Sequence, residues 1–210
     1  MTDFTKSFII FDFDGTLIDT APIVSNILNK FRRQLHLVPL SEAEVYPWIS
    51  EGGSSLISNC LSVSDESSKQ WLDEFRKVYS KMETPSTLLY DWVIKFLFYA
   101  KVKNCDLAIC SNKPQMLLAN ALNDICLTEF FSIVVGGSVK TEAKPNPERI
   151  EKILDEVECN RKNAVMIGDS LIDQKTCTNA NIDFVCYTGG YQKKEDFEDI
   201  QNRFNSIFEE

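Results

Sequence analysis

Short apolar runs that suit buried β-strands alternate with helical patterns along most of this chain. Because continuous apolar runs are typical of strands buried on both faces, the alternation predicts a parallel sheet covered by helices. We therefore expect an α/β fold with a Rossmann-like parallel sheet as its core. The predicted strands are Phe8–Phe11, Leu107–Cys110, Ile133–Val135, Ala164–Ile167 and Phe184–Cys186.

Two prolines and an aromatic stripe support the helices predicted between these strands. Trp92, Phe96 and Tyr99 fall on one face of a helix. Pro114 and Pro147 stand where a first helical turn would begin, a position at which the missing N–H costs nothing. The residue before Pro147 is an asparagine, which is well suited to capping the helix that follows.

The segment after the first strand lacks any strand-like run and is helical in pattern. Pro47 and the pair Gly52-Gly53 punctuate this pattern. We predict a small all-helical cap over residues 20–85, inserted into a core domain formed by residues 1–19 and 86–210. The apolar positions at helical spacing in the cap are Ile23, Ile27, Phe31, Leu35, Leu56, Cys60, Trp71, Phe75, Val78 and Met82.

Composition and charge narrow the class of protein. The chain has 210 residues, of which 44% are hydrophobic and 25% charged, as in ordinary globular proteins. A net charge of −9 argues against a nucleic-acid partner, which would require a basic face. The seven scattered cysteines suit reduced, buried thiols in a cytoplasmic protein. The longest apolar stretch, from Trp92 to Ala100, is broken by Lys95, so we expect no membrane partner.

Polar side chains follow three of the predicted strands. Asp12 and Asp14 follow the first strand two positions apart, and alternation starts them on the same side of the chain. Ser111-Asn112-Lys113 follows the second strand, and Gly168-Asp169-Ser170 follows the fourth, with Asp173 one helical turn later. Ligands of parallel sheets gather at the carboxyl ends of the strands. Carboxylates are ligands for Mg²⁺, whereas Ser, Asn and Lys donate hydrogen bonds to phosphate.

Each cluster alone has a structural explanation. An aspartate at a helix start is typically a cap, Ser-Asn before proline is typically a turn, and a lone loop lysine such as Lys144 is typically solvated. The pair Asp12 and Asp14 fits this explanation poorly, because aspartate disfavours strands and like charges repel. Three clusters of complementary charge at one edge of the sheet therefore favour a site for a metal ion and a phosphate.

Four motifs, in order along the chain, resemble those of the haloacid dehalogenase superfamily of phosphohydrolases. The helical insertion after the first motif resembles the type-1 cap of the phosphoglycolate phosphatase-like branch. The motifs are Asp12-Phe13-Asp14-Gly15-Thr16-Leu17, Ser111-Asn112-Lys113-Pro114, Lys144-Pro145-Asn146-Pro147-Glu148 and Gly168-Asp169-Ser170-Leu171-Ile172-Asp173.

Two departures from the family pattern lie outside the motifs. Tyr90-Asp91-Trp92-Val93 stands where family members usually carry Tyr-Pro-Gly-Val, a change that bears on how the cap is seated. Ala180-Asn181 replaces the usual Ala-Gly at a helix end, where asparagine tolerates the left-handed backbone. Neither change touches the residues of the expected chemistry.

The resemblance implies catalysis through an aspartyl-phosphate. Asp12 would be the nucleophile, and Asp14 would act first as general acid and then as base. The Asp12 carboxylate, the Asp14 backbone carbonyl and Asp169 would hold Mg²⁺ as the cofactor. Asp173 would orient Lys144 or a metal-bound water rather than bind the metal directly.

The resemblance also implies a set of residues that bind the substrate. Ser111 and Lys144 would hold the phosphate oxygens, with Asn112 in support, and Lys144 is counted among the catalytic residues as well. Gly15 and Thr16 would shape the turn after the nucleophile, where glycine supplies backbone freedom.

Three functions are compatible with these motifs. The leading hypothesis is a Mg²⁺-dependent phosphatase that hydrolyses a small phosphorylated metabolite, with phosphoglycolate among the candidates, as a monomer or homodimer. A phosphomutase of the β-phosphoglucomutase type would use the same two aspartates, but a sugar hydroxyl rather than water would receive the phosphoryl group. A non-catalytic phosphate-binding regulatory protein has no need of two carboxylates beside an anion. A dehalogenase is disfavoured because that branch typically lacks the aspartate that Asp14 supplies.

The remaining polar features are assigned structural roles. His36, the single histidine, is expected at the surface or in packing. Arg32-Arg33 is expected to be a solvated pair, and Gly52-Gly53-Ser54-Ser55 a connection between helices, with substrate contact from the cap as the alternative for both. The acidic segment Lys193–Glu210 is predicted to form an amphipathic terminal helix.

Overall fold

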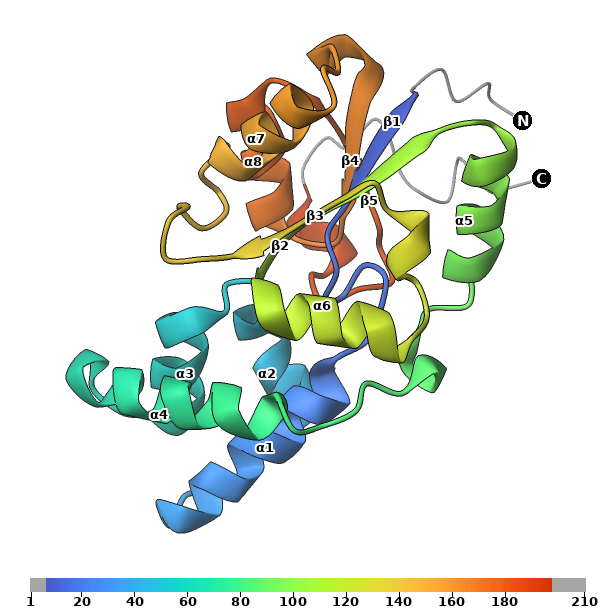
Figure 1. Ribbon diagram of the computed structural model, residues 1–210. Helices are drawn as coiled ribbons and strands as arrows, with labels where there is room; N and C mark the ends of the chain where they lie inside the picture. The colour runs from blue at the N-terminus through green and yellow to red at the C-terminus, as the bar shows by residue number, and fades with distance from the viewer. Residues whose placement is uncertain (1–6, 198–210) are drawn as a thin grey trace.

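The protein, shown as a computed structural model in Figure 1, is described for residues 7–197. Its sheet has five parallel strands in the order β3-β2-β1-β4-β5. The predicted α/β fold and all five predicted strands are confirmed, and β2 continues past its apolar part through the second motif. The strands are β1 (Phe8–Phe11), β2 (Asp106–Pro114), β3 (Ile133–Gly137), β4 (Ala164–Gly168) and β5 (Asp183–Cys186).

Eight α-helices accompany the sheet within the described residues. Four of them follow β1 directly in the sequence, and the other four alternate with the later strands. The helices are α1 (Ala21–Gln34), α2 (Glu42–Ile49), α3 (Gly53–Leu61), α4 (Asp65–Tyr79), α5 (Val93–Val102), α6 (Gln115–Asp124), α7 (Glu148–Glu156) and α8 (Leu171–Ala180).

Helices cover both faces of the sheet, and β1 illustrates how alternation directs side chains to each face. Ile9 and Phe11 pack in the cluster that includes α5 and α6, whereas Phe8 and Ile10 pack in the cluster that includes α7 and α8. Each fully buried side chain of this size stabilises the fold by about 1.5–3 kcal/mol. The apolar core therefore fixes the carboxyl end of β1, where the first motif begins.

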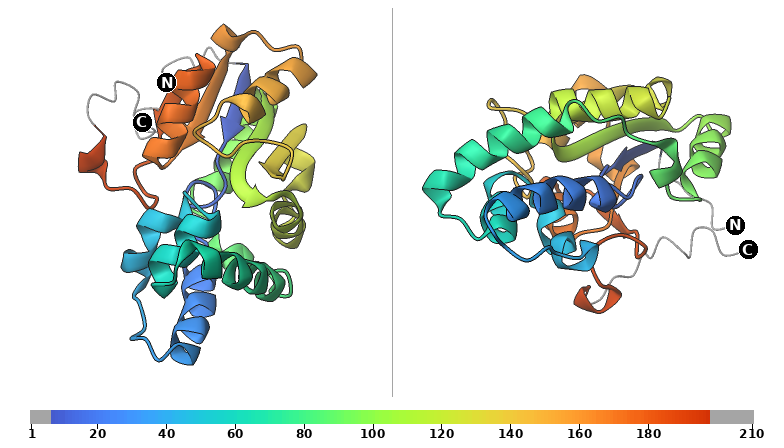
Figure 2. Two further views of the ribbon diagram at one scale, coloured as in Figure 1. Left: turned by 90° about the vertical axis from the view of Figure 1, so that its left-hand side faces the viewer. Right: turned by 90° about the horizontal axis from the view of Figure 1, so that it is seen from below.

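Helices α1–α4 form a separate layer next to the carboxyl ends of the strands, at the bottom of Figure 1 and in the left view of Figure 2. Their apolar faces pack into a core of their own, in which Ile27 and Ile57 are fully buried. Leu117 of α6 and Tyr191 join this core from the sheet domain. The exact domain boundaries at residues 20 and 85 stay a prediction.

The observed starts of α6 and α7 agree only in part with those predicted from the sequence. Asn146 Oδ1 accepts a hydrogen bond from the Glu148 N–H (2.9 Å), but the residue that directly precedes α7 is Pro147, so Asn146 lies one position further from the helix than predicted. Pro114 likewise directly precedes α6. The expected break at Pro47 is wrong, because this proline lies inside α2. It lies near the end of a short helix that a capping box at Ser41 stabilises from the other end.

The prediction of a solvated arginine pair is wrong for Arg32. Its guanidinium is buried and donates to the carbonyl oxygens of Val38 (2.6 Å) and Cys60. Cys60 lies in the last turn of α3, where a helix leaves carbonyl oxygens without internal partners. Arg33 is exposed, as expected, and His36 is exposed just after the end of α1.

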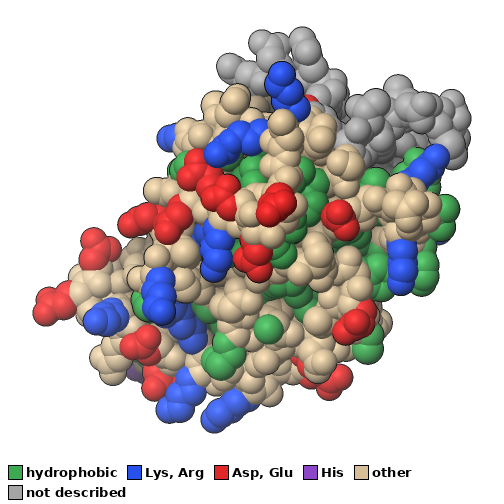
Figure 3. All heavy atoms as spheres, turned by 45° about the horizontal axis from the view of Figure 1, so that its top comes forward, with side chains coloured by type: hydrophobic (Ala, Val, Ile, Leu, Met, Phe, Trp, Pro, Cys, Tyr) green, Lys and Arg blue, Asp and Glu red, His purple; other side chains and the backbone are tan. Residues whose placement is uncertain are grey.

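Figure 3 shows acidic and basic side chains interspersed over the face that it presents. Within residues 7–197, no helix combines the length and the apolar character that crossing a bilayer requires. The terminal helix predicted for Lys193–Glu210 falls mostly on residues 198–210, which lie outside the described residues.

Candidate active site

The first motif leaves β1 in a tight loop at the edge of the sheet that faces the cap. The Asp12 N–H donates to the Ile167 carbonyl (2.9 Å), which continues the pairing of β1 with β4 beyond the strand. Gly15 has a positive φ of 81° and its N–H donates to the Ile18 carbonyl (2.9 Å), which closes the loop. This backbone conformation favours glycine, as the sequence predicted.

Asp12, Asp169 and Asp173 form a buried acidic cluster. One carboxylate oxygen from each lies within 4.8 Å of the other two, and the three residues are at most 3% exposed. Burial and then the neighbouring Asp173 raise the pKa of Asp12 to about 7. Burial, Asp173 and Asp12 likewise raise the pKa of Asp169 well above its ordinary value. Three carboxylates so close together in a dry site require compensating positive charge.

Lys144 supplies part of this charge from the loop before α7. Its Nζ lies 2.6 Å from Asp173 Oδ1 and 2.9 Å from Asp12 Oδ1. Burial alone would lower the pKa of Lys144, but the two carboxylates outweigh burial and hold the pKa above its ordinary value. One ammonium group facing three carboxyl groups leaves room for a further cation.

The residues present fit a magnesium ion. Asp12 Oδ1 is buried without a hydrogen-bond donor among the described residues, since its contact with Lys144 is an ion pair without hydrogen-bond alignment. Asp169 is held in place by Thr16 Oγ1 (2.9 Å) and the Tyr191 N–H (2.8 Å), which donate to its two carboxylate oxygens. A hard cation would bind the unsatisfied oxygen of Asp12 and the carboxylate of Asp169, which its two donors hold in place.

Asp173 is engaged on both of its carboxylate oxygens. Oδ1 accepts from Lys144 Nζ, and Oδ2 accepts from the Ser170 hydroxyl (2.5 Å) and N–H (3.2 Å) at the start of α8. This arrangement supports the expectation that Asp173 orients Lys144.

Asp14 is not part of the acidic cluster and has other partners, although alternation would start it on the same side as Asp12. The reason is that β1 ends at Phe11, so the alternation of an extended strand no longer applies. Asp14 Oδ1 accepts hydrogen bonds from Thr20 Oγ1 (2.7 Å) and from Lys113 Nζ (3.0 Å). The two aspartates therefore have different partners, as two different chemical roles require.

Within the second motif, Asn112 contacts the loop that carries Lys144, whereas Ser111 has a hydroxyl proton available for a ligand. Asn112 Oδ1 accepts from the Lys144 N–H (2.8 Å) and from Arg149 Nη1 (3.0 Å), while its amide nitrogen donates to the carbonyl of Ser50 in the cap (3.2 Å). The Asn112 side chain is therefore occupied in positioning Lys144. Ser111 Oγ accepts from the Lys113 N–H (3.2 Å), which leaves the hydroxyl proton to donate to a ligand.

Sequence reasoning left four residues of this site without a role: Thr20, Tyr79, Arg149 and Tyr191. The Tyr191 hydroxyl accepts from the N–H groups of Thr20 (2.8 Å) and Ala21 (3.1 Å), so this residue links Asp169 to the start of α1. The pair Gly189-Gly190 was the available signal, because a side chain at Gly190 would collide with Asp169. No local pattern marks Tyr79, which bonds to Lys113, 34 positions away.

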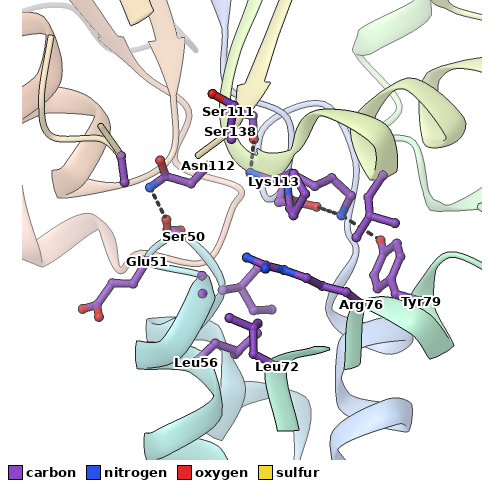
Figure 4. Close-up of a pocket in the computed structure, with 18 of the residues that line it drawn as sticks. Ser50, Glu51, Leu56, Leu72, Arg76, Tyr79, Ser111, Asn112, Lys113 and Ser138 are labelled. Atoms are coloured by element: carbon purple, nitrogen blue, oxygen red, sulfur yellow. Dashed lines mark hydrogen bonds and ion pairs between the residues drawn. The ribbon is translucent and has the colours of Figure 1, made fainter. Parts of the chain in front are cut away.

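A cavity of about 440 Å³ lies between the cap and the sheet, as the close-up in Figure 4 shows. Asp12 and Asp14 line its sheet side together with the residues of the second motif. The connection between α2 and α3 also lines the cavity, together with Gly53, the first residue of α3. This connection is shorter than predicted, because Gly53, Ser54 and Ser55 belong to α3. The apolar side chains of the lining are Val24, Ile49, Leu56, Leu72, Phe75, Pro114, Leu117, Val139 and Ala143.

The close packing around Gly15 gives a first testable prediction. A Cβ at Gly15 would overlap the Asp169 carboxylate and the Tyr191 ring, whereas one at Gly53 would meet nothing within 4 Å. Because both glycines have positive φ, Gly53→Ala is a matched control for backbone strain. We expect Gly15→Ala to lower the free energy of unfolding by roughly 2–5 kcal/mol and Gly53→Ala by about 1 kcal/mol, measured by urea denaturation. Equal losses would show that Gly15 is not packed against Asp169.

The chain matches one protein family and is similar to several known proteins over most of its length. Residues 9–187 match the family described as haloacid dehalogenase-like hydrolase. A phosphoglycolate phosphatase of Rhodobacter capsulatus is 34% identical over 189 residues, which cover 88% of this chain and 85% of the relative. One of Colwellia psychrerythraea is 31% identical over 199 residues, covering 91% and 88%. The crystal structure of a predicted phosphoglycolate phosphatase from Haemophilus somnus 129PT has the same fold, with a TM-score of 0.79, 23% identity, and coverage of 90% and 88%.

Proposed function

Because the chain belongs to the haloacid dehalogenase-like hydrolases, and within them is similar to phosphatases over most of its length, we propose that it is a Mg²⁺-dependent phosphatase that works through an aspartyl-phosphate. The observation that carries the proposal is the convergence of Asp12, Asp169 and Lys144 in one buried cluster, of which Asp12 lines the cavity. Asp14 lies beside this cluster in separate surroundings.

The proposed reaction has two steps, each assigned to residues of the first motif. In the first step, an Asp12 carboxylate oxygen attacks the phosphorus atom, and the ester oxygen leaves with the bonding electrons and takes a proton from Asp14. In the second step, water attacks the phosphorus atom of the aspartyl-phosphate and gives a proton to Asp14. Phosphate leaves and the Asp12 carboxylate is restored. Both attacks need the in-line arrangement that a rigid loop after β1 provides.

Charge neutralisation is divided between a metal ion and this chain's own donors. Mg²⁺ held by the Asp12 carboxylate, Asp169 and the Asp14 carbonyl would offset the repulsion between the anionic nucleophile and the anionic phosphate. Lys144 Nζ and the Ser111 hydroxyl are the donors proposed for the phosphate oxygens. Asp173 orients Lys144 through the 2.6 Å contact described above.

We propose 2-phosphoglycolate as the first substrate to test, because relatives 31–34% identical to this chain are phosphoglycolate phosphatases. The cavity of about 440 Å³ accommodates a small phosphomonoester. Purified protein should release phosphate from 2-phosphoglycolate and from p-nitrophenyl phosphate when Mg²⁺ is present, and not after chelation. Absence of hydrolysis across a broad panel of phosphate esters would refute the proposal.

Binding of Mg²⁺ should stabilise the folded protein. At ten times its dissociation constant, a ligand of the folded state contributes about 1.4 kcal/mol, which is about 3–6 °C in Tm for a chain of this size. The folded-state pKa of Asp12 is about 7, above its ordinary value, so at pH 5.5 the ion must displace a proton. We therefore expect a smaller shift at pH 5.5 than at pH 7.5 in a thermal-shift assay.

Asp169→Asn is the matched control for this measurement, because it keeps the shape of the side chain and removes its charge. The Mg²⁺-dependent shift in Tm should disappear in this variant. An unchanged shift would mean that Mg²⁺ binds elsewhere.

A further inference from the structure

Lys113 is a buried cation to which the proposed reaction gives no role. It lines the cavity and is only 9% exposed. Its Nζ donates to Asp14 Oδ1 (3.0 Å) and to the hydroxyl of Tyr79 from cap helix α4 (2.8 Å), as the dashed lines in Figure 4 indicate. Burial would lower the pKa of Lys113, but Asp14 and Tyr79 outweigh burial and keep the amine charged.

The hydrogen bonds of Lys113 leave one donor unused. An ammonium group carries three N–H donors, and two of them have acceptors among the described residues. Nζ also lies near the rings of Tyr79 (4.2 Å to the centroid) and Phe13 (5.8 Å), and the apolar cavity lining from α4 and α6, namely Leu72, Phe75 and Leu117, offers no hydrogen-bond acceptor. A buried donor that lines a cavity and has no protein acceptor favours a ligand that brings its own acceptor, and a charged donor favours an anionic one.

The position of Lys113 identifies which part of a substrate would meet this donor. Asp14 must lie within hydrogen-bond distance of the ester oxygen that it protonates. Lys113 Nζ is 3.0 Å from Asp14, so it lies on the leaving-group side of the site. Lys144, in contrast, contacts Asp12 and lies on the phosphate side. In a phosphorylated 2-hydroxy acid, the carboxylate is attached to the carbon that bears the ester oxygen.

We propose that Lys113, held between Asp14 and Tyr79, binds the carboxylate next to the ester oxygen and thereby selects phosphate esters of 2-hydroxy acids. The inference rests on the proposed phosphatase activity and extends it to the class of leaving group. Since Tyr79 belongs to the cap and Asp14 to the core, the carboxylate site is complete only when the cap is seated on the sheet.

Arg76 is the competing candidate for an anionic leaving group. Its side chain extends from α4 into the cavity in Figure 4, and it is exposed. No side-chain hydrogen bond or ion pair engages it among residues 7–197. Arg76 is exposed, whereas Lys113 is buried and hydrogen-bonded to Asp14, so Arg76 suits an anionic group remote from the ester oxygen.

The test compares two esters that differ only in charge, 2-phosphoglycolate and its amide, 2-phosphoglycolamide. We expect the wild-type protein to favour the carboxylate over the amide in kcat/KM by about tenfold to a hundredfold. Lys113→Met removes the charge at similar length, and the ratio should fall to near one. Lys113→Arg should retain part of the preference. Arg76→Met, the matched loss of a cavity cation, should leave the ratio unchanged.

The outcomes separate the inference from the proposed function. Equal losses of kcat/KM with both esters in Lys113→Met would mean that Lys113 only positions Asp14, which would overturn the inference. A fall of the carboxylate-to-amide ratio to near one in Arg76→Met would also overturn it.

If Lys113→Met does not fold, Tyr79→Phe provides the second variant. It should lower the ratio several-fold by releasing Lys113, and an unchanged ratio contradicts the inference. Hydrolysis of p-nitrophenyl phosphate by wild-type protein that does not discriminate between the two esters refutes the inference alone. Absence of any hydrolysis refutes the proposed function and the inference with it.

Discussion

Replacing Asp12 with asparagine should lower kcat for phosphate esters by roughly 10⁴-fold or more, because the variant has no carboxylate to attack phosphorus. The side chain keeps its shape, so the packing of the cap on the core and the binding of the substrate should be preserved. The loss should appear with every phosphate ester and at every Mg²⁺ concentration. The measurement is steady-state hydrolysis of p-nitrophenyl phosphate and 2-phosphoglycolate.

The same variant should not lose stability, which separates a chemical role of Asp12 from a structural one. In the folded protein the pKa of Asp12 is raised to about 7, so its ionisation opposes folding increasingly from pH 4 to 7. Asparagine removes this cost, and the free energy of unfolding at pH 7.5 should stay equal or rise. Asp106→Asn, at an exposed aspartate that begins β2, is the control and should change neither property. Turnover at the wild-type rate by Asp12→Asn would end the proposed mechanism.

Replacing Lys144 with methionine should damage both activity and stability. The change leaves Asp12 and Asp173 buried without their ammonium partner, and breaking a buried ion pair from one side costs about 3–5 kcal/mol. Because the pKa of Asp12, which burial already raises to about 7, would rise further without Lys144, the folded state would hold a proton that the unfolded state releases. The loss of stability should therefore be larger at pH 7.5 than at pH 5, measured by urea denaturation at both values.

A second substitution tests whether the destabilisation has this electrostatic origin. Adding Asp173→Asn to Lys144→Met removes one of the two stranded carboxylates, so the double variant should regain part of the lost stability. Activity should not return, since the donor to the phosphate is still missing. Additive losses from the two substitutions would show that Lys144 and Asp173 are not energetically coupled.

The site was predictable from the sequence where a strand delivers a residue to the edge of the sheet. Asp12 and Asp169 each follow an apolar run that forms a parallel strand, so their meeting followed from the rule that such ends share an edge. The direction of Asp14 was not predictable in the same way. The loop closed by Gly15 turns the chain, and the partners of Asp14 come from the start of α1 and the end of β2.

Residues that act across the boundary between cap and core were the least predictable. Tyr79 ends an ordinary amphipathic helix, and nothing in its local pattern distinguishes it from other buried aromatic residues. Arg32 was assigned to solvent because arginine pairs are usually solvated, yet Val38 in the loop after α1 and Cys60 in the last turn of α3 present carbonyl oxygens to it. Contacts of this kind depend on how two layers are placed, which a one-dimensional pattern does not encode.

The most direct test of the account is a crystal structure of the protein with Mg²⁺ and beryllium trifluoride, an analogue of a phosphoryl group attached to a carboxylate. The account predicts beryllium bonded to an Asp12 oxygen, Mg²⁺ in contact with Asp12 and Asp169, and fluorine atoms facing Lys144 and Ser111. Beryllium bonded to any other residue, or Mg²⁺ bound away from Asp169, would contradict it.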